Sequence, residues 1–308
     1  MNILHIHRKD IHVNAWNAAV TADSSHLPYA YSWYLDAVCA GRWSALVLED
    51  YSAVMPLPWN RKLLGFRQIY RPPLCQQLGV FGAAVDKKMQ EEFLKAIPGE
   101  YAYLRYPIKK GSGNFGEFPP GLSSFERQNL ILDLSRDYEN IKANYSKSLR
   151  KRLRKAIAEQ KVQPSSDLDG LLKFYQQHLK EKAQLTKTHF RQLEALFQVM
   201  LSRGWADIYE VLDHQDYRLC MGLFFKTPGR IINVFGASNQ QGREQYSMHI
   251  LLDHLIQVSS GQDLLFDFEG SDIPGVAAFF KSFGAVTEPY LELSLNRLPP
   301  GLKQWKMR

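Results

Sequence analysis

The stretch of sequence that decides the fold is LLFDFEGSDIPGVAAFFKSFGA, residues 264–285. Apolar and other side chains alternate over residues 264–268, which predicts a strand with one buried face. Gly270 is the turn residue that closes this strand. Apolar spacing over residues 273–283 then predicts a short helix, with Pro274 at a permitted first-turn position. We therefore expect the order strand, turn, helix.

The sequence around this stretch shows the periodicities of an α+β protein. Two helices precede three strands joined by turn residues, and another helix then leads into the stretch above. The expected elements are helices over 168–179, 190–204 and 248–256, and strands over 206–212, 218–226, 230–236 and 291–295. This order predicts a sheet with mixed pairing, because helices alternate with hairpin-like strands.

The first half of the chain repeats this order less clearly. The total of 308 residues suits two domains better than one. A long helix is expected over residues 137–160, where apolar residues recur every fourth position. We place the domain boundary at its start. The expected domains are residues 1–136, a degenerate module, and residues 137–308.

Composition excludes several classes of protein. Hydrophobic residues make up 45% and charged residues 22%, as in ordinary folded proteins, so disorder is not expected. No apolar run approaches the ~20 residues that span a bilayer, and the first ten residues lack the apolar core of a signal peptide. We therefore expect a cytoplasmic protein with no transmembrane segment. The net charge of +7 favours anionic partners.

Cysteine and histidine give no sign of a metal site. Cys39, Cys75 and Cys220 are too few and too widely spaced for a disulfide framework or a metal clip. His5 and His7 form a strand-like pair without further ligands nearby. We predict three reduced thiols and no bound metal.

Three further observations concern the segments NYSKSLRKRLRKA at 144–156, FGASN at 235–239, and the part of the opening stretch from 266 to 285. Together these segments resemble the FemAB-like superfamily, whose members have tandem GNAT-like modules. The resemblance covers the second half of the chain and the junction, and the last segment is the most specific. It implies an α+β fold of two tandem GNAT-like (acyl-CoA N-acyltransferase-like) modules with mixed central sheets. It also implies transfer of an activated acyl group to an amine.

The donor remains open at this point. The best-known members of the superfamily use aminoacyl-tRNA to build cell-wall cross-bridges, and other relatives use acyl-CoA. The sequence lacks the long helical-hairpin insertion of some cell-wall enzymes, which counts against a tRNA donor. The Gln240–Arg243 turn has one glycine instead of the full GNAT diphosphate-binding pattern, which counts against acetyl-CoA. We expect no permanently bound cofactor, with acyl-CoA or aminoacyl-tRNA as co-substrate and a small-molecule or peptide amine as acceptor.

The strand-turn-helix stretch supplies the candidate catalytic residues Asp267, Glu269 and Lys281. Alternation places both carboxylates on the face opposite the phenylalanines. Close carboxylates raise each other's pKa unless a cation pairs with them, so one is a candidate base for the acceptor ammonium. By the resemblance, Lys281 stabilises negative charge in the transition state. The alternatives are that Asp267 caps a loop and that Lys281 is an ordinary exposed lysine.

The candidate binding residues are cationic. Lys147, Arg150, Lys151 and Arg154 share one helix face, which suits the phosphates of a donor. A solvated helix face is an equally good interpretation. Arg71, in a Pro-rich loop, is a candidate clamp for an acceptor carboxylate or phosphate, although a surface arginine explains it as well.

These features favour an acyl or aminoacyl transferase that acts without a covalent enzyme intermediate. An acyl-CoA-dependent N-acyltransferase of the same fold is the nearest alternative. A non-catalytic protein that binds an anion or a partner is the alternative from another class.

Overall fold

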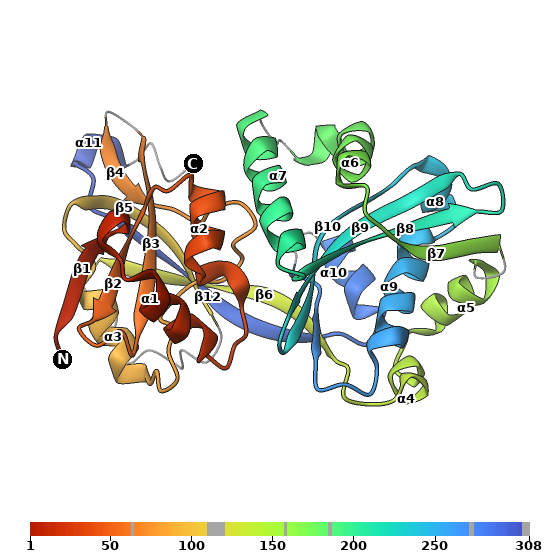
Figure 1. Ribbon diagram of the computed structural model, residues 1–308, viewed down its shortest axis with the longest axis horizontal. Coiled ribbons are helices and arrows are strands. Elements are labelled where there is room, and N and C mark those ends of the chain that lie inside the picture. The colour runs from red at the N-terminus through yellow and green to blue at the C-terminus, as the bar shows by residue number, and fades with distance from the viewer. Residues whose placement is uncertain (63–64, 110–120, 157–158, 184–186, 271–273, 304–308) are drawn as a thin grey trace. The chain divides into compact units, whose positions relative to one another are not determined.

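The computed structural model describes residues 1–62, 65–109, 121–156, 159–183, 187–270 and 274–303. The chain divides into two compact units (Figure 1). Unit 1 contains Met1–Arg127 and Pro289–Arg308, and unit 2 contains Gln128–Glu288. None of the described helices combines the length and the apolar character needed to cross a bilayer.

Unit 1 has a mixed sheet in the order β1-β2-β3-β4-β5-β12, whose neighbours are antiparallel except for β4 and β5. The strands are β1 (Ile3–His7), β2 (Trp43–Leu48), β3 (Val54–Lys62), β4 (Phe66–Ile69), β5 (Tyr101–Ile108) and most of β12 (Val286–Asn296). The helices are α1 (Val13–Thr21), α2 (Ser32–Cys39), α3 (Lys87–Lys95) and α11 (Pro300–Lys303).

Unit 2 has the same pattern, in the order β7-β8-β9-β10-β11-β6, with β10 and β11 parallel and the other neighbours antiparallel. The strands are β7 (Gln160–Ser165), β8 (Ala206–Asp213), β9 (Arg218–Thr227), β10 (Arg230–Ser238), β11 (Leu265–Asp267) and the end of β6 (Leu122–Asp133). The helices are α4 (Tyr138–Ala143), α5 (Lys147–Ala156), α6 (Leu168–Ala183), α7 (Lys187–Ser202), α8 (Gln240–Glu244), α9 (Ser247–Ser259) and α10 (Pro274–Lys281).

The two halves of the chain exchange their last strands. β12, from the second half, pairs with β5 in unit 1, and β6, from the first half, pairs with β11 in unit 2. The repeated strand order confirms the expected α+β fold of two modules with mixed sheets. The compact units do not coincide with the division expected after residue 136, because β6 enters unit 2 before that point and the chain returns to unit 1 at Pro289.

The prediction of a single helix over residues 137–160 is wrong. The chain forms α4 and α5 instead, separated by residues 144–146. Ser146 breaks the helix because its backbone N–H donates to the carbonyl of Ser282 and its hydroxyl accepts from the N–H of Leu149. The hydroxyl thus caps α5, which begins anew beside the end of α10.

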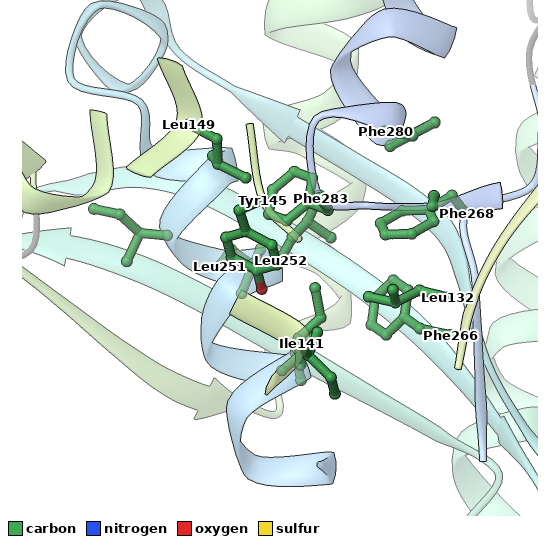
Figure 2. Close-up of a cluster of buried hydrophobic side chains, with 14 of the residues drawn as sticks. Leu132, Ile141, Tyr145, Leu149, Leu251, Leu252, Phe266, Phe268, Phe280 and Phe283 are labelled. Carbon is green, nitrogen blue, oxygen red and sulfur yellow. The ribbon is translucent and has the colours of Figure 1, made fainter. Parts of the chain in front are cut away.

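One face of the unit 2 sheet carries a core of aliphatic and aromatic side chains from α4, α5, α9 and α10 (Figure 2). Phe266 and Phe268 are both buried in it, as their alternation predicted. The ring of Phe268 stacks on Phe280 at 4.9 Å, and Phe283 meets Tyr145 edge-on at 5.4 Å. These contacts confirm the predicted order of strand, turn and helix and fix α10 against β11.

The opposite face of this sheet is covered by α6 and α7. Neighbouring residues of a strand point to opposite faces, so Phe225 faces away from the α9 side, where Phe224 is buried. Phe225 contacts Phe197 of α7 with ring centroids 6.2 Å apart. The ring of Tyr175, on α6, stacks on Phe235 of β10 at 3.8 Å. Helices on both faces therefore hold the middle of the sheet rigidly.

The packing of α9 gives a direct stability prediction. Leu251 is fully buried, so Leu251→Ala should lower the free energy of unfolding by about 2–5 kcal/mol through lost contacts and a cavity. Val258 lies on the same helix and is 53% exposed, so Val258→Ala should change it by about 0.5 kcal/mol or less. Urea denaturation followed by circular dichroism measures both. Equal losses in the two variants would contradict the assigned packing of α9.

Candidate functional site

The unit 2 sheet diverges at its parallel pair. β10 and β11 pair only where Arg230–Ile232 lie beside Leu265–Asp267. β10 then bulges between Asn233 and Phe235 and continues to Ser238, where its described sheet neighbour is β9. The chain beyond β11 stays beside β6 instead, because the N–H of Phe268 donates to the carbonyl of Leu130 in that strand. Ligands of open sheets that contain parallel strands bind beyond the carboxyl ends of diverging strands, so this position is the candidate site.

The corresponding position in unit 1 is filled by the protein itself. After the β4–β5 pair, Leu78 forms a further parallel bridge with Ile108 and exchanges hydrogen bonds with Pro107 and Lys109. The ammonium of Lys109 lies 2.5 Å from the Asp23 carboxylate, and both side chains are buried. Burial lowers the pKa of Lys109, and the charge of Asp23 opposes that shift. In unit 1, Leu78 thus continues the parallel pairing along β5 beyond the end of β4.

A buried ion-pair network supports the end of β11. Arg230 Nη1 lies 2.5 Å from Asp267 Oδ2 and 3.4 Å from Glu288 Oε2. Asp267 is fully buried and the other two residues nearly so. Burial raises the pKa of Asp267, and the charge of Arg230 acts in the opposite direction. The arginine is therefore what allows two carboxylates to lie together inside the unit.

The same network holds the turn that follows β11. The backbone N–H of Glu269 donates to Asp267 Oδ1 at 2.9 Å, and that of Gly270 donates to Asn129 Oδ1 at 2.9 Å. The amide of Asn129 in turn donates to Glu288 Oε2 at 3.2 Å. The side chains of Asp267, Asn129 and Glu288, which form these bonds, are all buried. Buried side chains thus hold the backbone of the turn, which carries the half-buried side chain of Glu269.

The backbone of this turn is unusual. Glu269 has a φ of +49°, in the left-handed region that residues with a side chain seldom adopt. A Cβ added at Gly270 would lie 1.8 Å from the carbonyl oxygen of Gln128, so only glycine fits there. Strained non-glycine residues held by their surroundings cluster at binding and catalytic sites. This supports Glu269 as a candidate functional residue.

Asp267 does not share the position of Glu269. Its carboxylate pairs with Arg230 and accepts the N–H of Glu269, so it is enclosed by the protein. The expectation that both carboxylates project together is corrected, because the left-handed backbone at Glu269 breaks the strand alternation. These contacts match the alternative interpretation of Asp267 as a loop-capping residue. Glu269 is the carboxylate of the pair that retains contact with solvent.

Lys281 is the last residue of α10 and is exposed. Phe280, before it, is buried against Phe268, so the helix that carries the lysine is held firmly on the core. Its ammonium forms no ion pair with any residue that the structure describes. Glu269 and Lys281 belong to the same unit, and the residues 271–273 between them lie outside the described part of the chain.

Helix α5 presents the predicted basic face. Lys147, Lys151 and Arg154 are exposed, and Arg150 donates from Nη1 to the carbonyl of Ala143 at 3.3 Å. The apolar residues of this helix are buried on its other side, in the core shown in Figure 2. The face is therefore available to an anion, while its role in donor binding remains a prediction.

Arg152 is the most firmly held cation of this helix. Its Nη1 lies 3.3 Å from Nε2 of His249, and its guanidinium carbon lies 5.2 Å from the ring centroid of Tyr246. Burial and the charge of Arg152 lower the pKa of His249 to about 4, so the imidazole is neutral at pH 7. Arginine can only donate, so Nε2 accepts and the ring proton resides on Nδ1. Arg152 thus keeps its full charge in a defined position, without an ion-pair partner among the described residues.

Sequence reasoning missed several of these residues. His249 lies in the first turn of α9, in contact with Phe279 at 4.7 Å, and appeared in the sequence as one of several scattered histidines. Arg230, Asn129 and Glu288 belong to no motif in the sequence. No local signal identifies them, because their partners lie between 37 and 159 positions away in the chain.

Arg71 lies apart from the other predicted residues in the chain. It is exposed in the loop after β4 and belongs to unit 1, whereas the other predicted site residues belong to unit 2. Its proposed contact with the acceptor therefore stays a prediction.

Cys39 and Cys220 do not supply a nucleophile at neutral pH. All three cysteines are buried, and none forms a disulfide bond. Burial raises the pKa of Cys39 and of Cys220 to about 12, so both remain thiols. Among the residues that the structure describes, no cluster of histidine, cysteine or acidic side chains is arranged to hold a metal ion.

Arg230→Met tests the buried network. Without the guanidinium, Asp267 and Glu288 remain buried without that cation, so the free energy of unfolding at pH 7 should fall by about 3–5 kcal/mol. A carboxyl whose pKa is raised in the folded state lowers the free energy of unfolding as pH rises. The difference between Arg230→Met and wild type should therefore shrink towards about pH 4. Arg218→Met is the matched control, because Arg218 pairs with Glu210 and Asp167 while partly exposed, and it should cost about 1 kcal/mol or less. Urea denaturation at both pH values measures the free energy of unfolding of each variant. A pH-independent deficit would contradict the assigned burial.

His249 predicts an acid-sensitive contribution to stability. Its folded pKa of about 4 lies below its ordinary value of 6.5, so its contribution is complete above about pH 6.5 and is lost as pH falls towards 4. His249→Gln should flatten this part of the stability profile, whereas His214→Gln, at an exposed turn, should not. Thermal unfolding between pH 4 and 7 provides the measurement. Parallel profiles for wild type and His249→Gln would refute the prediction.

Comparison with solved structures shows which known proteins share this fold. No family model matches the sequence, and no curated protein matches it significantly. Among solved structures, FemX aligns over 100% of both chains with a TM-score of 0.70 at 14% identity. L-PGS from Bacillus licheniformis aligns over 96% of this chain and 94% of its own, with a TM-score of 0.55 at 14% identity.

A tandem GNAT protein from the clavulanic acid biosynthesis pathway aligns over 97% of this chain and 99% of its own, with a TM-score of 0.54 at 12% identity. The TM-scores and the coverage establish the fold. At sequence identities this low they do not establish the reaction, which has to be inferred from the site. The resemblance to the FemAB-like superfamily is thereby confirmed at the level of fold. The chain has the FemX-like fold of two tandem GNAT-like modules.

Proposed function

We propose that the protein transfers an acyl or aminoacyl group from an activated donor to an amine acceptor, and that unit 2 carries the reaction. The observation that supports this most is the end of the β10–β11 pairing beside the anchored turn of Glu269. The fold adds support, because it is shared with a tandem GNAT protein and with the C-terminal domain of a putative lysylphosphatidylglycerol synthetase.

The proposed chemistry is direct attack within a ternary complex. Glu269 accepts a proton from the acceptor ammonium, and the resulting amine forms a bond to the donor carbonyl carbon. The carbonyl oxygen takes up the displaced electron pair, and its negative charge is stabilised by the ammonium of Lys281. The carbonyl then re-forms as the bond to the donor oxygen or sulfur breaks, and the leaving group takes up the proton that the new amide nitrogen releases. Asp267 supports the reaction indirectly by holding the turn.

The basic face of α5 is the proposed contact for the donor. Aminoacyl-tRNA and acyl-CoA both carry phosphates, which Lys147, Lys151 and Arg154 would attract over a distance. Arg152 is held in place by His249 and Tyr246, so it loses less freedom on binding an anion than the flexible lysines do. We propose Arg71 as a contact for a carboxylate or phosphate of the acceptor.

The turn that resembles a CoA-binding motif is occupied by the protein's own contacts. The N–H of Gly242 donates to Asn239 Oδ1 at 2.7 Å, and a Cβ at this glycine would lie 2.2 Å from the carbonyl oxygen of Leu219. Arg243 donates to the carbonyl of Ser238 at 2.6 Å. Gly242 thus serves internal packing, which counts against this turn as a diphosphate cradle and favours the aminoacyl donor. Acyl-CoA is retained as the second donor to be tested.

Lys281→Ala tests the mechanism. Loss of one electrostatic stabiliser should reduce turnover roughly 100–1000-fold. Because Lys281 is exposed, stability should change by no more than about 0.5 kcal/mol. Lys173→Ala, at an exposed position of α6, is the matched control and should retain full turnover. The assay incubates the full chain with aminoacyl-tRNA or acyl-CoA and a panel of amines, and detects N-acylated products by mass spectrometry.

The outcomes separate the alternatives. Product from one donor class that disappears in Lys281→Ala supports the proposal and names the donor. Undiminished turnover in this variant contradicts the mechanism. Tight binding of a donor without product from any amine supports the non-catalytic anion-binding alternative instead.

A further inference from the structure

Unit 1 contains a pocket on its sheet, separate from the residues assigned above. The pocket has a volume of about 400 Å³ and is formed by β5, β12 and the first residues of β6. A volume of this size is within the range of small-molecule sites. The lining residues are Tyr103, Arg105, Gly121, Ser123, Phe125, Ser294 and Asn296.

The floor of the pocket is one face of the sheet. Arg105 lies directly opposite Ser294, and Tyr103 lies directly opposite Asn296, in the antiparallel pairing of β5 and β12. The hydroxyl of Ser123, on β6, donates to the carbonyl of Ser294 at 3.2 Å. Leu104 alternates with the lining residues of β5 and is buried in the core. The pocket is therefore built from regular strands whose other face is fixed, so its shape is preformed.

Two arginines and one glutamate lie beside this floor. Arg105 Nε lies 2.5 Å from Glu292 Oε1, and Arg127 Nε lies 3.0 Å from Glu292 Oε2. Glu292 is only 5% exposed. Two guanidinium groups thus share one buried carboxylate. The side chain of Arg105 is 52% exposed, so its guanidinium is oriented by Glu292 and still accessible.

The pocket also displays an aromatic ring. Phe125 is 55% exposed, which is high for a large apolar side chain. It shares the pocket with Tyr103. Removing an apolar side chain from water stabilises a complex by about 25 cal/mol per Å², so a flat apolar group placed on Phe125 would gain from its burial. Oriented positive charge and aromatic surface thus occur together within one small volume.

We propose that this pocket binds a small anionic ligand in which a carboxylate or phosphate is attached to a flat aromatic group. The anion pairs with the guanidinium of Arg105, and the ring lies against Phe125. The hydroxyl of Ser294 can donate to a remaining oxygen of the anion. This inference goes beyond the proposed transfer and does not depend on it, because it rests on residues of unit 1 alone.

The test uses defined probes with the full chain. N-acetylphenylalanine carries the carboxylate, phenyl phosphate carries the phosphate, and N-acetylphenylalaninamide is the neutral match of the first. Ligand-observed NMR titrations give the three dissociation constants. At least one anion should bind at least about tenfold more tightly than the neutral amide, since hydrogen bonds to charged groups contribute about 1.5–3 kcal/mol. The preferred anion distinguishes a carboxylate ligand from a phosphate ligand.

Variants assign the binding to the pocket. Arg105→Gln and Phe125→Ser should each weaken the preferred anion about tenfold or more. Arg67→Gln is the matched control, because Arg67 pairs with Glu100 in the same unit outside the pocket, and it should leave binding unchanged. Phe125 is exposed, so its variant tests the proposal even if Arg105→Gln impairs folding. Equal affinity for acid and amide, no saturable binding of either anion, or unchanged binding in both pocket variants would overturn it.

Discussion

The site in unit 2 depends on one ion pair, that of Arg230 with Asp267. The arginine begins β10 and the aspartate ends β11, so the pair fastens the only stretch over which these strands run together. Beyond it the strands separate, and the carboxylate is left to accept the N–H of Glu269. Desolvation makes an ion pair of this kind a poor source of net stability. Its value lies in geometry, because it fixes Asp267, which accepts the N–H of the left-handed Glu269.

The exchange of last strands explains why the two units differ in chemistry. Unit 2 receives β6 from the first half, and this strand brings Asn129, whose side chain bonds both the turn and Glu288. Unit 1 receives β12, which brings Glu292 to Arg105 and Arg127. In unit 1 the position between the parallel strands is closed by Leu78 and by the pair of Lys109 with Asp23. Similar strand orders thus support a candidate site beside the parallel strands of unit 2 and a separate pocket in unit 1.

Much of the fold could be predicted from local sequence, and much of the site could not. The alternation around Phe266 and the apolar stripe of α5 depend on neighbouring residues, so both expectations were confirmed. The long helix over 137–160 failed because a distant carbonyl, that of Ser282, captures the N–H of Ser146. The contacts of Asp267 could not be predicted, because alternation gives the face of a side chain but not its partner, which is Arg230. The residues that hold the turn come from β6, β10 and β12, and only the folded sheet brings them together.

Native-state hydrogen exchange at the turn after β11 tests the central claim most directly. The amides of Glu269 and Gly270 donate to the buried side chains of Asp267 and Asn129. They should therefore exchange slowly in the wild type. In Asn129→Ala, the Gly270 amide should exchange at least about tenfold faster, the equivalent of about 1.4 kcal/mol, while the amides of α9 keep their protection. Fast exchange at both positions in the wild type, or no change in the variant, would show that the buried network does not hold the turn.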